Sequence, residues 1–298
     1  MIGSNVSTVG GIVNAFHQAQ KWGCECIQIY TTPSRTWRVC DRLESENALF
    51  KEAWKNSTVK CVIAHVPFLV NMASNKTELC IKSIHRLCQE LNSACSLGID
   101  RIVIHPGSCD ETDVDAVIEK IGEGINEAFS MTKGNPVKLL LETMPGQGNQ
   151  IGKTFEEIQA IIESIKDNSR IGVCCDTCHM YSAGYNIRGY SGFYSTMKEM
   201  EIVIGLEKIG AFHVNDSAYA LDSKRDRHAS IGEGYLGLEA FHALVNDPRF
   251  DMVPKIIENP NQNEKSLDDL QKLRGLRGIP GKIKDSPISI SDVQLDLF

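Results

Sequence analysis

Short runs of apolar residues alternate along the chain with longer segments in which apolar residues recur at helical spacing. Eight short runs predict strands, and they are MIGSNV (1–6), CIQIY (26–30), CVIAH (61–65), RIVIH (101–105), KLLLE (138–142), GVCCD (172–176), GAFHV (210–214) and PKIIE (254–258). All but the first are mostly apolar and rich in Ile, Val and Leu, as strands buried on both faces must be. The pattern therefore predicts parallel strands that are covered by helices.

The helical segments show a clear division between apolar and polar faces. In the helix predicted over 76–98, one face carries Cys80, Ile84, Leu87, Cys88, Leu91 and Cys95. We expect Lys82, Arg86 and Glu90 on the opposite, polar face of this helix. Another helix is predicted to begin at Thr154, where Glu157 completes a capping box ahead of an apolar run.

Eight strands that alternate with helices over 298 residues are typical of an α/β fold of the (β/α)8 type, a TIM barrel. A doubly wound sheet is the structural alternative, but it does not normally space eight units so evenly. We expect a single barrel domain over 1–277, where the last helical pattern stops. The segment 278–298 contains Pro, Gly and Ser residues and is predicted to be a flexible tail.

Composition narrows the class of protein further. A hydrophobic content of 42% argues against disorder, and the longest apolar-leaning stretch, 61–73, is too short for a membrane span. No secretion signal is recognised at the start, and eleven scattered cysteines predict reduced thiols in the cytoplasm. We interpret Cys175 and Cys178 as packing thiols rather than as a redox pair or half a zinc site. The net charge of −7 argues against binding a polyanion through basicity alone.

Histidines and carboxylates mark the ends of six predicted strands. His65, His105, Glu142, Asp176 and Glu258 each end a run, and His213 lies one residue before the end of its own. Consecutive members are 40, 37, 34, 37 and 45 residues apart, about one β/α unit each time. In a barrel these positions converge on the C-terminal mouth of the strands, where active sites are built. Imidazole and carboxylate groups are ligands that suit zinc and related metals.

Three further candidate ligands follow the sixth and seventh strands. His179 comes three residues after Asp176, and Asp226 and His228 are separated by one residue. Five histidines and four carboxylates exceed what one ion can use and would crowd two, so we expect three ions with one bridging carboxylate. Three divalent ions would bring the net charge from −7 to about −1 and make the mouth electropositive, as phosphoryl chemistry requires. The remaining histidines are interpreted as structural or solvent-facing, namely His17, His85 and His242.

Several specific strings of the sequence resemble the endonuclease IV family, the type-2 apurinic/apyrimidinic (AP) endonucleases. They extend over nearly the whole chain and are AHVPFLVN (64–71), IHPGS (104–108), LETMPGQGNQIG (141–152), GVCCDTCHMYSAGY (172–185), HVNDS (213–217), DRHASIGEG (226–234) and IIENP (256–260). All nine metal-ligand positions of the family are occupied by the expected residue types.

The resemblance implies a trinuclear zinc hydrolase of the deoxyribonuclease IV type. Such enzymes cut DNA 5′ to an abasic site, leave a 3′-hydroxyl and a 5′-deoxyribose phosphate, and also clean blocked 3′ ends. A metal-bridging hydroxide is the expected in-line nucleophile, with Glu258 and Glu142 as catalytic residues. Carried over by position, one Zn²⁺ binds His65, His105 and Glu142, a second binds Glu142, Asp176, His213 and Glu258, and a third binds His179, Asp226 and His228.

The resemblance also indicates residues that contact double-stranded DNA. Arg35 and Trp37 match one DNA-reading loop, and Phe68 and Leu69 match another, since arginines and apolar wedges suit a minor groove with a missing base. The alternative is that Trp37 and Phe68 only cap the barrel mouth. We favour Arg227 as a phosphate contact, and we interpret its basic neighbours Lys224 and Arg225 as a solvated face.

The sequence departs from the family at some positions. Ala218 and Tyr219 stand where Lys and Gly are usual, Asn186 replaces a common Asp, and TTPSR (31–35) replaces a Lys-Asn start. These departures bear on substrate preference and not on the metal ligands.

The C-terminal end resembles another known motif. QLDLF (294–298) is similar to the peptide by which bacterial proteins dock on the DNA sliding clamp, a partner that Gln294, Leu295, Leu297 and Phe298 would contact. The alternative is a segment that folds back on its own barrel. We expect the protein to be a monomer.

Two other classes of function remain open at this point. Related barrels that act as sugar isomerases or epimerases hold one or two metals at strand ends, but they do not need the third set of His179, Asp226 and His228. A non-catalytic scaffold for DNA or for the clamp is the second alternative, and the intact ligand set argues against it.

Overall fold

Eight parallel strands form the centre of the molecule. The computed structural model describes residues 1–39, 42–110, 113–258 and 264–278. Within them the strands close into a barrel in the order β1-β10-β7-β6-β5-β4-β3-β2. Their bounds are β1 (Ile2–Asn5), β2 (Cys26–Ile29), β3 (Cys61–His65), β4 (Arg101–Ile104), β5 (Lys138–Glu142), β6 (Ile171–Asp176), β7 (Ile209–His213) and β10 (Lys255–Ile257). The predicted barrel is confirmed, and each predicted strand is within one residue of the observed bounds at either end.

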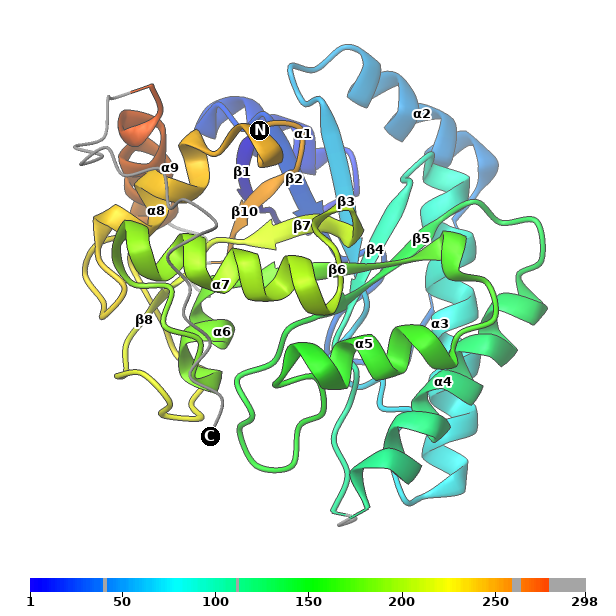
Figure 1. The fold of residues 1–298 in the computed structure, drawn as a ribbon. Helices are drawn as coiled ribbons and strands as arrows, with labels where there is room; N and C mark the ends of the chain where they lie inside the picture. The colour runs from blue at the N-terminus through cyan, green and yellow to red at the C-terminus, as the bar shows by residue number, and fades with distance from the viewer. Residues whose placement is uncertain (40–41, 111–112, 259–263, 279–298) are drawn as a thin grey trace.

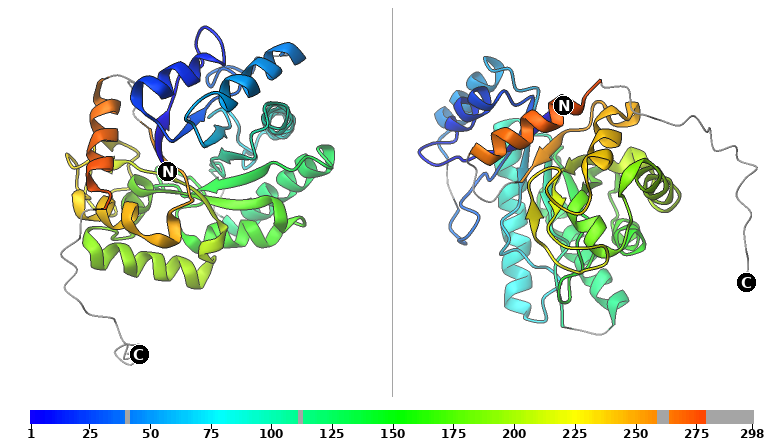
Figure 2. Two further views of the ribbon diagram at one scale, coloured as in Figure 1. Left: turned by 90° about the horizontal axis from the view of Figure 1, so that it is seen from above. Right: turned by 90° about the vertical axis from the view of Figure 1, so that its left-hand side faces the viewer.

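Helices surround the barrel on the outside (Figures 1 and 2). They are α1 (Asn14–Trp22), α2 (Glu44–Lys55), α3 (Thr77–Leu97), α4 (Val114–Met131), α5 (Phe155–Ser164), α6 (Thr177–Ala183), α7 (Gly189–Val203), α8 (Leu238–Asn246) and α9 (Glu264–Leu276), with short 3-10 turns η1 (Asn168–Arg170), η2 (Leu206–Lys208) and η3 (Pro248–Phe250). A small antiparallel ladder of β8 (Asp216–Ser217) and β9 (His228–Ala229) lies outside the barrel sheet. Among the described helices, none is long and apolar enough to cross a membrane.

Two apolar cores hold the barrel together. The larger core lies between the strands and the helices. The smaller core fills the barrel interior and consists of Cys26, Cys61, Ile63, Val103, Leu140, Cys174, Ala211 and Ile256. Cys175 and Cys178 are fully buried, and burial raises the pKa of the Cys178 thiol to about 12. Both therefore have the packing environment that we predicted for them.

The predicted polar face of the helix at 76–98 is covered in the structure. This helix is α3, and its Arg86 and Glu90 lie opposite the apolar face but are only 2% and 0% exposed. The reason is that the loop after β2 covers this side of the helix, which helical periodicity cannot foresee. Only Lys82 of the three residues is exposed.

The capping box predicted at Thr154 is half correct. The Thr154 hydroxyl accepts a hydrogen bond from the Glu157 backbone N–H at 3.1 Å, as expected. The Glu157 carboxylate instead accepts from the backbone N–H groups of Gly152 and Lys153, so it ties α5 to the preceding loop. The tail predicted beyond the barrel falls almost entirely in residues 279–298, which lie outside the described residues.

Candidate metal centre

The candidate ligands continue the alternation of the barrel interior. Side chains of a strand point alternately to its two faces, so the position two residues after an interior side chain also points inward. This relation holds for six pairs, which are Ile63 and His65, Val103 and His105, Leu140 and Glu142, Cys174 and Asp176, Ala211 and His213, and Ile256 and Glu258. All six polar residues therefore lie at the C-terminal mouth.

The strand ends differ slightly from the prediction. β7 ends at His213, so this histidine occupies the last strand position instead of the one before it. β4 and β10 end one residue before His105 and Glu258. These side chains point inward because side chains alternate along an extended backbone. Their direction therefore does not depend on which residue makes the last hydrogen bond of the sheet.

Glu142 lies between two groups of ligands. Its Oε2 atom is 3.1 Å from Nε2 of both His65 and His105. Its Oε1 atom is 3.0 Å from Nδ1 of His213 and 3.3 Å from Nδ1 of His179. A carboxylate that presents one oxygen to each side has the geometry of a bridging ligand.

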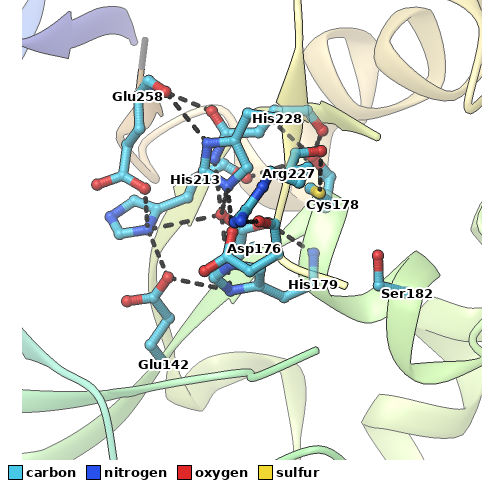
Figure 3. Close-up of polar contacts among 12 residues, drawn as sticks. Glu142, Asp176, Cys178, His179, Ser182, His213, Arg227, His228 and Glu258 are labelled. Carbon is cyan, nitrogen blue, oxygen red and sulfur yellow. Dashed lines mark hydrogen bonds and ion pairs between the residues drawn. The ribbon is translucent and has the colours of Figure 1, made fainter. Parts of the chain in front are cut away.

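The nine predicted ligands assemble into three groups. Within each group, ligand atoms lie no more than 4.8 Å apart, and the groups are His65–His105–Glu142, Glu142–Asp176–His213–Glu258 and His179–Asp226–His228. Figure 3 shows part of this arrangement, in which His213 contacts both Glu142 and Glu258. The geometry also brings the Cys178 thiol near Asp176 and His228, and this thiol donates to the Arg227 backbone carbonyl at 3.5 Å.

Local hydrogen bonds place the third group. The Asp176 carboxylate caps α6 by accepting from the His179 backbone N–H at 2.8 Å, which turns the chain so that His179 faces the mouth. Asp226 lies in the segment between β8 and β9, and His228 is the first residue of β9. Asp216 of β8 anchors the segment that follows β9, because its buried carboxylate accepts hydrogen bonds from the backbone N–H groups of Gly232, Gly234 and Leu236 as well as from that of Ser217.

The histidine rings are oriented as metal ligands require. Nδ1 of His65, His179 and His228 lies 2.7, 3.0 and 3.2 Å from the backbone carbonyls of Val66, Thr143 and Glu258. Carbonyls of this kind hold the ring and leave the other nitrogen free to bind a metal. The buried Nε2 atoms of His179 and His228 lie 3.2 and 3.4 Å from Asp226 Oδ1, but neither has a partner with hydrogen-bond geometry among the described residues. These orphaned nitrogens beside Asp226 and Asp176 show that the residues fit a metal group.

Electrostatics show how strongly the site is charged. Burial opposes charge on Glu142, but the imidazoles of His213, His105 and His179 hold the pKa of its carboxyl well below the usual value. Burial likewise opposes charge on His179, but the carboxylates of Asp176, Asp226 and Glu142 raise its pKa well above the usual value. The carboxylates of the cluster therefore favour bound cations. Metal ions can replace the protons that the histidines would otherwise bind.

Two buried amides that the sequence reasoning did not single out support the ligands. The Gln28 side chain is fully buried, donates to Glu258 Oε1 at 2.7 Å and accepts from Nε2 of His213 at 2.8 Å. The Asn215 amide donates to Asp176 Oδ2 at 2.6 Å, and its oxygen accepts from the Glu258 backbone N–H at 3.0 Å. Gln28 follows the interior residue Cys26 by two positions, so the same alternation could have identified it.

The structure separates the predicted DNA contacts into two sets. Arg35, Phe68 and Arg227 line a cavity of about 490 Å³ that also contains Glu142 and Glu258. The Phe68 ring is 57% exposed and lies 5.4 Å from the ring of His105. Trp37 and Leu69 do not line this cavity. Trp37 packs against the outer core, with Lys82 Nζ located 4.6 Å from its ring centre.

A second cavity lies at the other end of the barrel. It has a volume of about 900 Å³ and is lined by residues at the N-terminal ends of strands, among them Met1, Cys61 and Arg101. None of the candidate ligands or predicted DNA contacts lines it. The candidate functional site is therefore the cavity of about 490 Å³ that Glu142 and Glu258 line.

The three histidines interpreted as structural or solvent-facing lie away from the cluster. His17 and His85 are exposed on α1 and α3. His242 is buried on α8 and shares a hydrogen bond of 3.1 Å with the Tyr190 hydroxyl. All three positions agree with that interpretation.

The fold and the site together define a TIM-barrel protein with a candidate multinuclear metal centre at its mouth. Residues 16–276 match the family model described as a xylose isomerase-like TIM barrel. "Probable endonuclease 4" of Trichlorobacter lovleyi is 37% identical over 277 residues, which are 92% of this chain and 99% of that protein. The protein of the same name from Geobacter sulfurreducens is 38% identical over 277 residues, covering 92% and 94% of the two chains. The chain belongs to the endonuclease IV family.

Solved structures agree with this family. The crystal structure of endonuclease IV from Thermus thermophilus has a TM-score of 0.82 at 29% identity and covers 92% of this chain and 98% of its own. A D-tagatose 3-epimerase-like protein has a TM-score of 0.72 at 19% identity, covering 92% and 96% of the two chains. The second similarity concerns the barrel fold alone.

Proposed function

We propose that the protein is a zinc-dependent AP endonuclease that hydrolyses the phosphodiester bond 5′ to an abasic site in double-stranded DNA. The products are a 3′-hydroxyl and a 5′-deoxyribose phosphate, and the same site removes blocking groups from 3′ ends. The observation that carries this proposal is the third ligand group, His179, Asp226 and His228, next to the groups joined by Glu142. A one- or two-metal sugar isomerase has no use for that group.

The ligand set matches the chemistry of zinc. The nine predicted ligands are five imidazoles and four carboxylates, which suit divalent ions of intermediate softness. Bound ions would polarise the phosphodiester and supply hydroxide at neutral pH. Three ions are proposed because the ligands form three groups that share Glu142.

The chain's own residues bind and orient the substrate. Arg35 and Arg227 are exposed beside the cavity and can neutralise backbone phosphates, which fixes the register of the DNA. Phe68 gives the cavity an apolar wall next to His65 and His105. An abasic nucleotide has no base to unstack, so it enters such a cavity at low cost.

Glu258 is the proposed catalytic residue at the centre of this arrangement. Its side chain is 17% exposed, with Oε2 located 3.1 Å from Nδ1 of His213 and Oε1 held by Gln28. It is therefore both fixed in direction and accessible from the cavity. Glu142 shares the catalytic role through its position between the groups.

The decisive experiment uses a DNA duplex with one tetrahydrofuran abasic analogue, which cannot undergo β-elimination. We expect a single cut 5′ to the analogue by the wild type, and loss of cutting after prolonged chelation or in Glu258→Gln. Glu239→Gln, at an exposed position on α8, is the matched control and should cut normally. Absence of any cut by protein that contains three zinc ions per chain would refute the nuclease assignment.

The C-terminal motif is a separate proposal. Gln294, Leu295, Leu297 and Phe298 are proposed to bind the bacterial sliding clamp, although they lie outside the described residues. Deletion of 294–298 should abolish binding to purified clamp and leave the cutting of a short duplex unchanged. Equal clamp binding by the deleted and full chains would refute this role.

A further inference from the structure

A polar stripe on α3 faces the loop that follows β2. The stripe consists of Lys82, Arg86, Glu90 and Ser93, which recur at helical spacing along the outside of the barrel. The loop comprises residues 31–38 and contains turns and bends but no helix or strand. Three residues of the stripe contact the loop itself, and Ser93 accepts from Arg42 just beyond it.

Glu90 holds the first part of this loop. Its carboxylate is 0% exposed and accepts hydrogen bonds from the hydroxyl groups of both Thr31 and Thr32. These two residues directly follow β2 and Tyr30 in the chain. The point at which the loop leaves the barrel is therefore fixed from the side of α3.

Arg86 holds the far part of the loop. Its Nε atom donates to Glu90 Oε1 at 2.8 Å, and its Nη2 atom donates to the Thr32 hydroxyl. Its Nη1 atom donates to the backbone carbonyls of Thr36 at 3.4 Å and Arg38 at 3.2 Å. The planar guanidinium thus connects the two ends of the loop through one buried group.

Stability alone does not explain why the ion pair of Arg86 and Glu90 is buried. Taking two charges out of water costs several kcal/mol per ion, and well-packed apolar residues often stabilise a protein equally well. A buried pair whose hydrogen bonds are all used does, however, hold its partners in one geometry. Those partners lie on both sides of Arg35, which is exposed and lines the cavity of the metal centre.

We propose that Arg86 and Glu90 are positioning residues for substrate binding: they hold the 31–38 loop so that Arg35 is presented to a DNA phosphate beside the metal centre. This inference rests on the proposed function, because it assigns Arg35 to the substrate. Arg86 and Glu90 do not reach the cavity themselves. Their effect is therefore on the KM for DNA and not on the chemical step.

The test compares Arg86→Lys with the wild type on the tetrahydrofuran duplex. Lysine retains a charge for Glu90 but cannot span Thr32 and the two carbonyls at once. We expect KM to rise about tenfold, as for the loss of one hydrogen bond to a charged group, with kcat and zinc content within about twofold. In an Arg35→Ala background, the same change should alter KM by less than about twofold, because the residue being positioned is absent.

The matched control is Arg170→Lys, another buried arginine that donates to backbone carbonyls, those of Val137 and Thr132. It lies in η1, ahead of β6, and lines no part of the metal-centre cavity. It should lower the melting temperature and leave KM unchanged. A KM that is unchanged in Arg86→Lys, or that rises equally with and without Arg35, overturns the positioning role.

A readout that does not depend on activity completes the test. Trypsin cleavage of the native protein after Arg35 and Arg38 should be faster in Arg86→Lys than in the wild type or in Arg170→Lys. Equal cleavage rates in all three would overturn the proposal even if the enzyme cuts DNA normally. If the wild type fails to cut DNA, the proposed function is refuted instead. The proteolysis rates do not depend on DNA cutting, so the two failures can be distinguished.

Discussion

Replacement of Gln28 by leucine tests whether a buried amide sets the geometry of the metal centre. Gln28 is 0% exposed and joins His213 to Glu258 through hydrogen bonds of 2.8 and 2.7 Å. Because Gln28 accepts from Nε2 of His213, it keeps Nδ1 of this ring directed at Glu142 and Glu258. Leucine has a similar volume, so Gln28→Leu removes the polar contacts without opening a large cavity.

The magnitude follows from the two contacts. Outer-shell partners of metal ligands typically contribute 10–100-fold to metal affinity, which corresponds to roughly 1.4–2.7 kcal/mol. We therefore expect Gln28→Leu to lose metal at about a tenfold to hundredfold lower concentration of a competing chelator. In the metal-free protein, each of the two polar groups left unpaired costs about 1–3 kcal/mol of unfolding free energy.

The assay is an equilibrium competition with a chelator, followed by measurement of bound metal per chain. Gln159→Leu is the matched control, because Gln159 is a half-buried residue of α5 whose side chain donates to Glu163 on the same helix and does not line the metal-centre cavity. It should bind metal as the wild type does. If Gln28→Leu retains its metal as tightly as the wild type, the argument that Gln28 orients His213 is refuted.

Three further predictions concern stability. Asp216→Asn should lower the unfolding free energy by about 3 kcal/mol in urea titrations, because an amide cannot accept all four backbone hydrogen bonds; an unchanged midpoint would contradict this. Arg277 lowers the pKa of the Glu25 carboxyl to about 2, so the stability that this charge adds is present above pH 4.5 and lost as pH falls toward 2. Glu25→Gln should thus be less stable by about 1 kcal/mol at pH 7 after solvent screening, with the difference vanishing at pH 2, and a constant difference across this range would argue against the linkage. Phe155→Ala should cost about 3–5 kcal/mol in calorimetry, since Phe155 is fully buried and stacks on Tyr185 with 4.0 Å between ring centres; a loss below about 1 kcal/mol would mean that the site collapses around the missing ring.

The sequence by itself determined the barrel and the approximate position of the centre. Strands buried on both faces appear as short apolar runs, and the runs at 61–65 and 138–142 were found with their observed bounds. A ligand at the end of each run needs no further information, because the topology of a parallel barrel brings all strand ends to one mouth. The predicted ligands accordingly lie in three compact groups.

Tertiary structure decided how that centre is supported. Gln28 and Asn215 reach ligands on other strands, and no local spacing in the sequence connects β2 with β10 across the closure of the barrel. The role of Asp216 also depends on tertiary structure, since three of its four partners belong to a loop 16 to 20 residues further along the chain.

The helices around the barrel likewise combine features that the sequence predicts with features that only tertiary contacts determine. Helical periodicity placed Arg86 and Glu90 on the face opposite the apolar one, and the 31–38 loop lies over that face and buries both. Trp37, a candidate DNA contact, packs against the outer core, with Lys82 Nζ located 4.6 Å from its ring centre. Periodicity reports which residues share a face, because the pitch of a helix is local. What covers that face depends on contacts between segments distant in sequence, and those exist only in the folded chain.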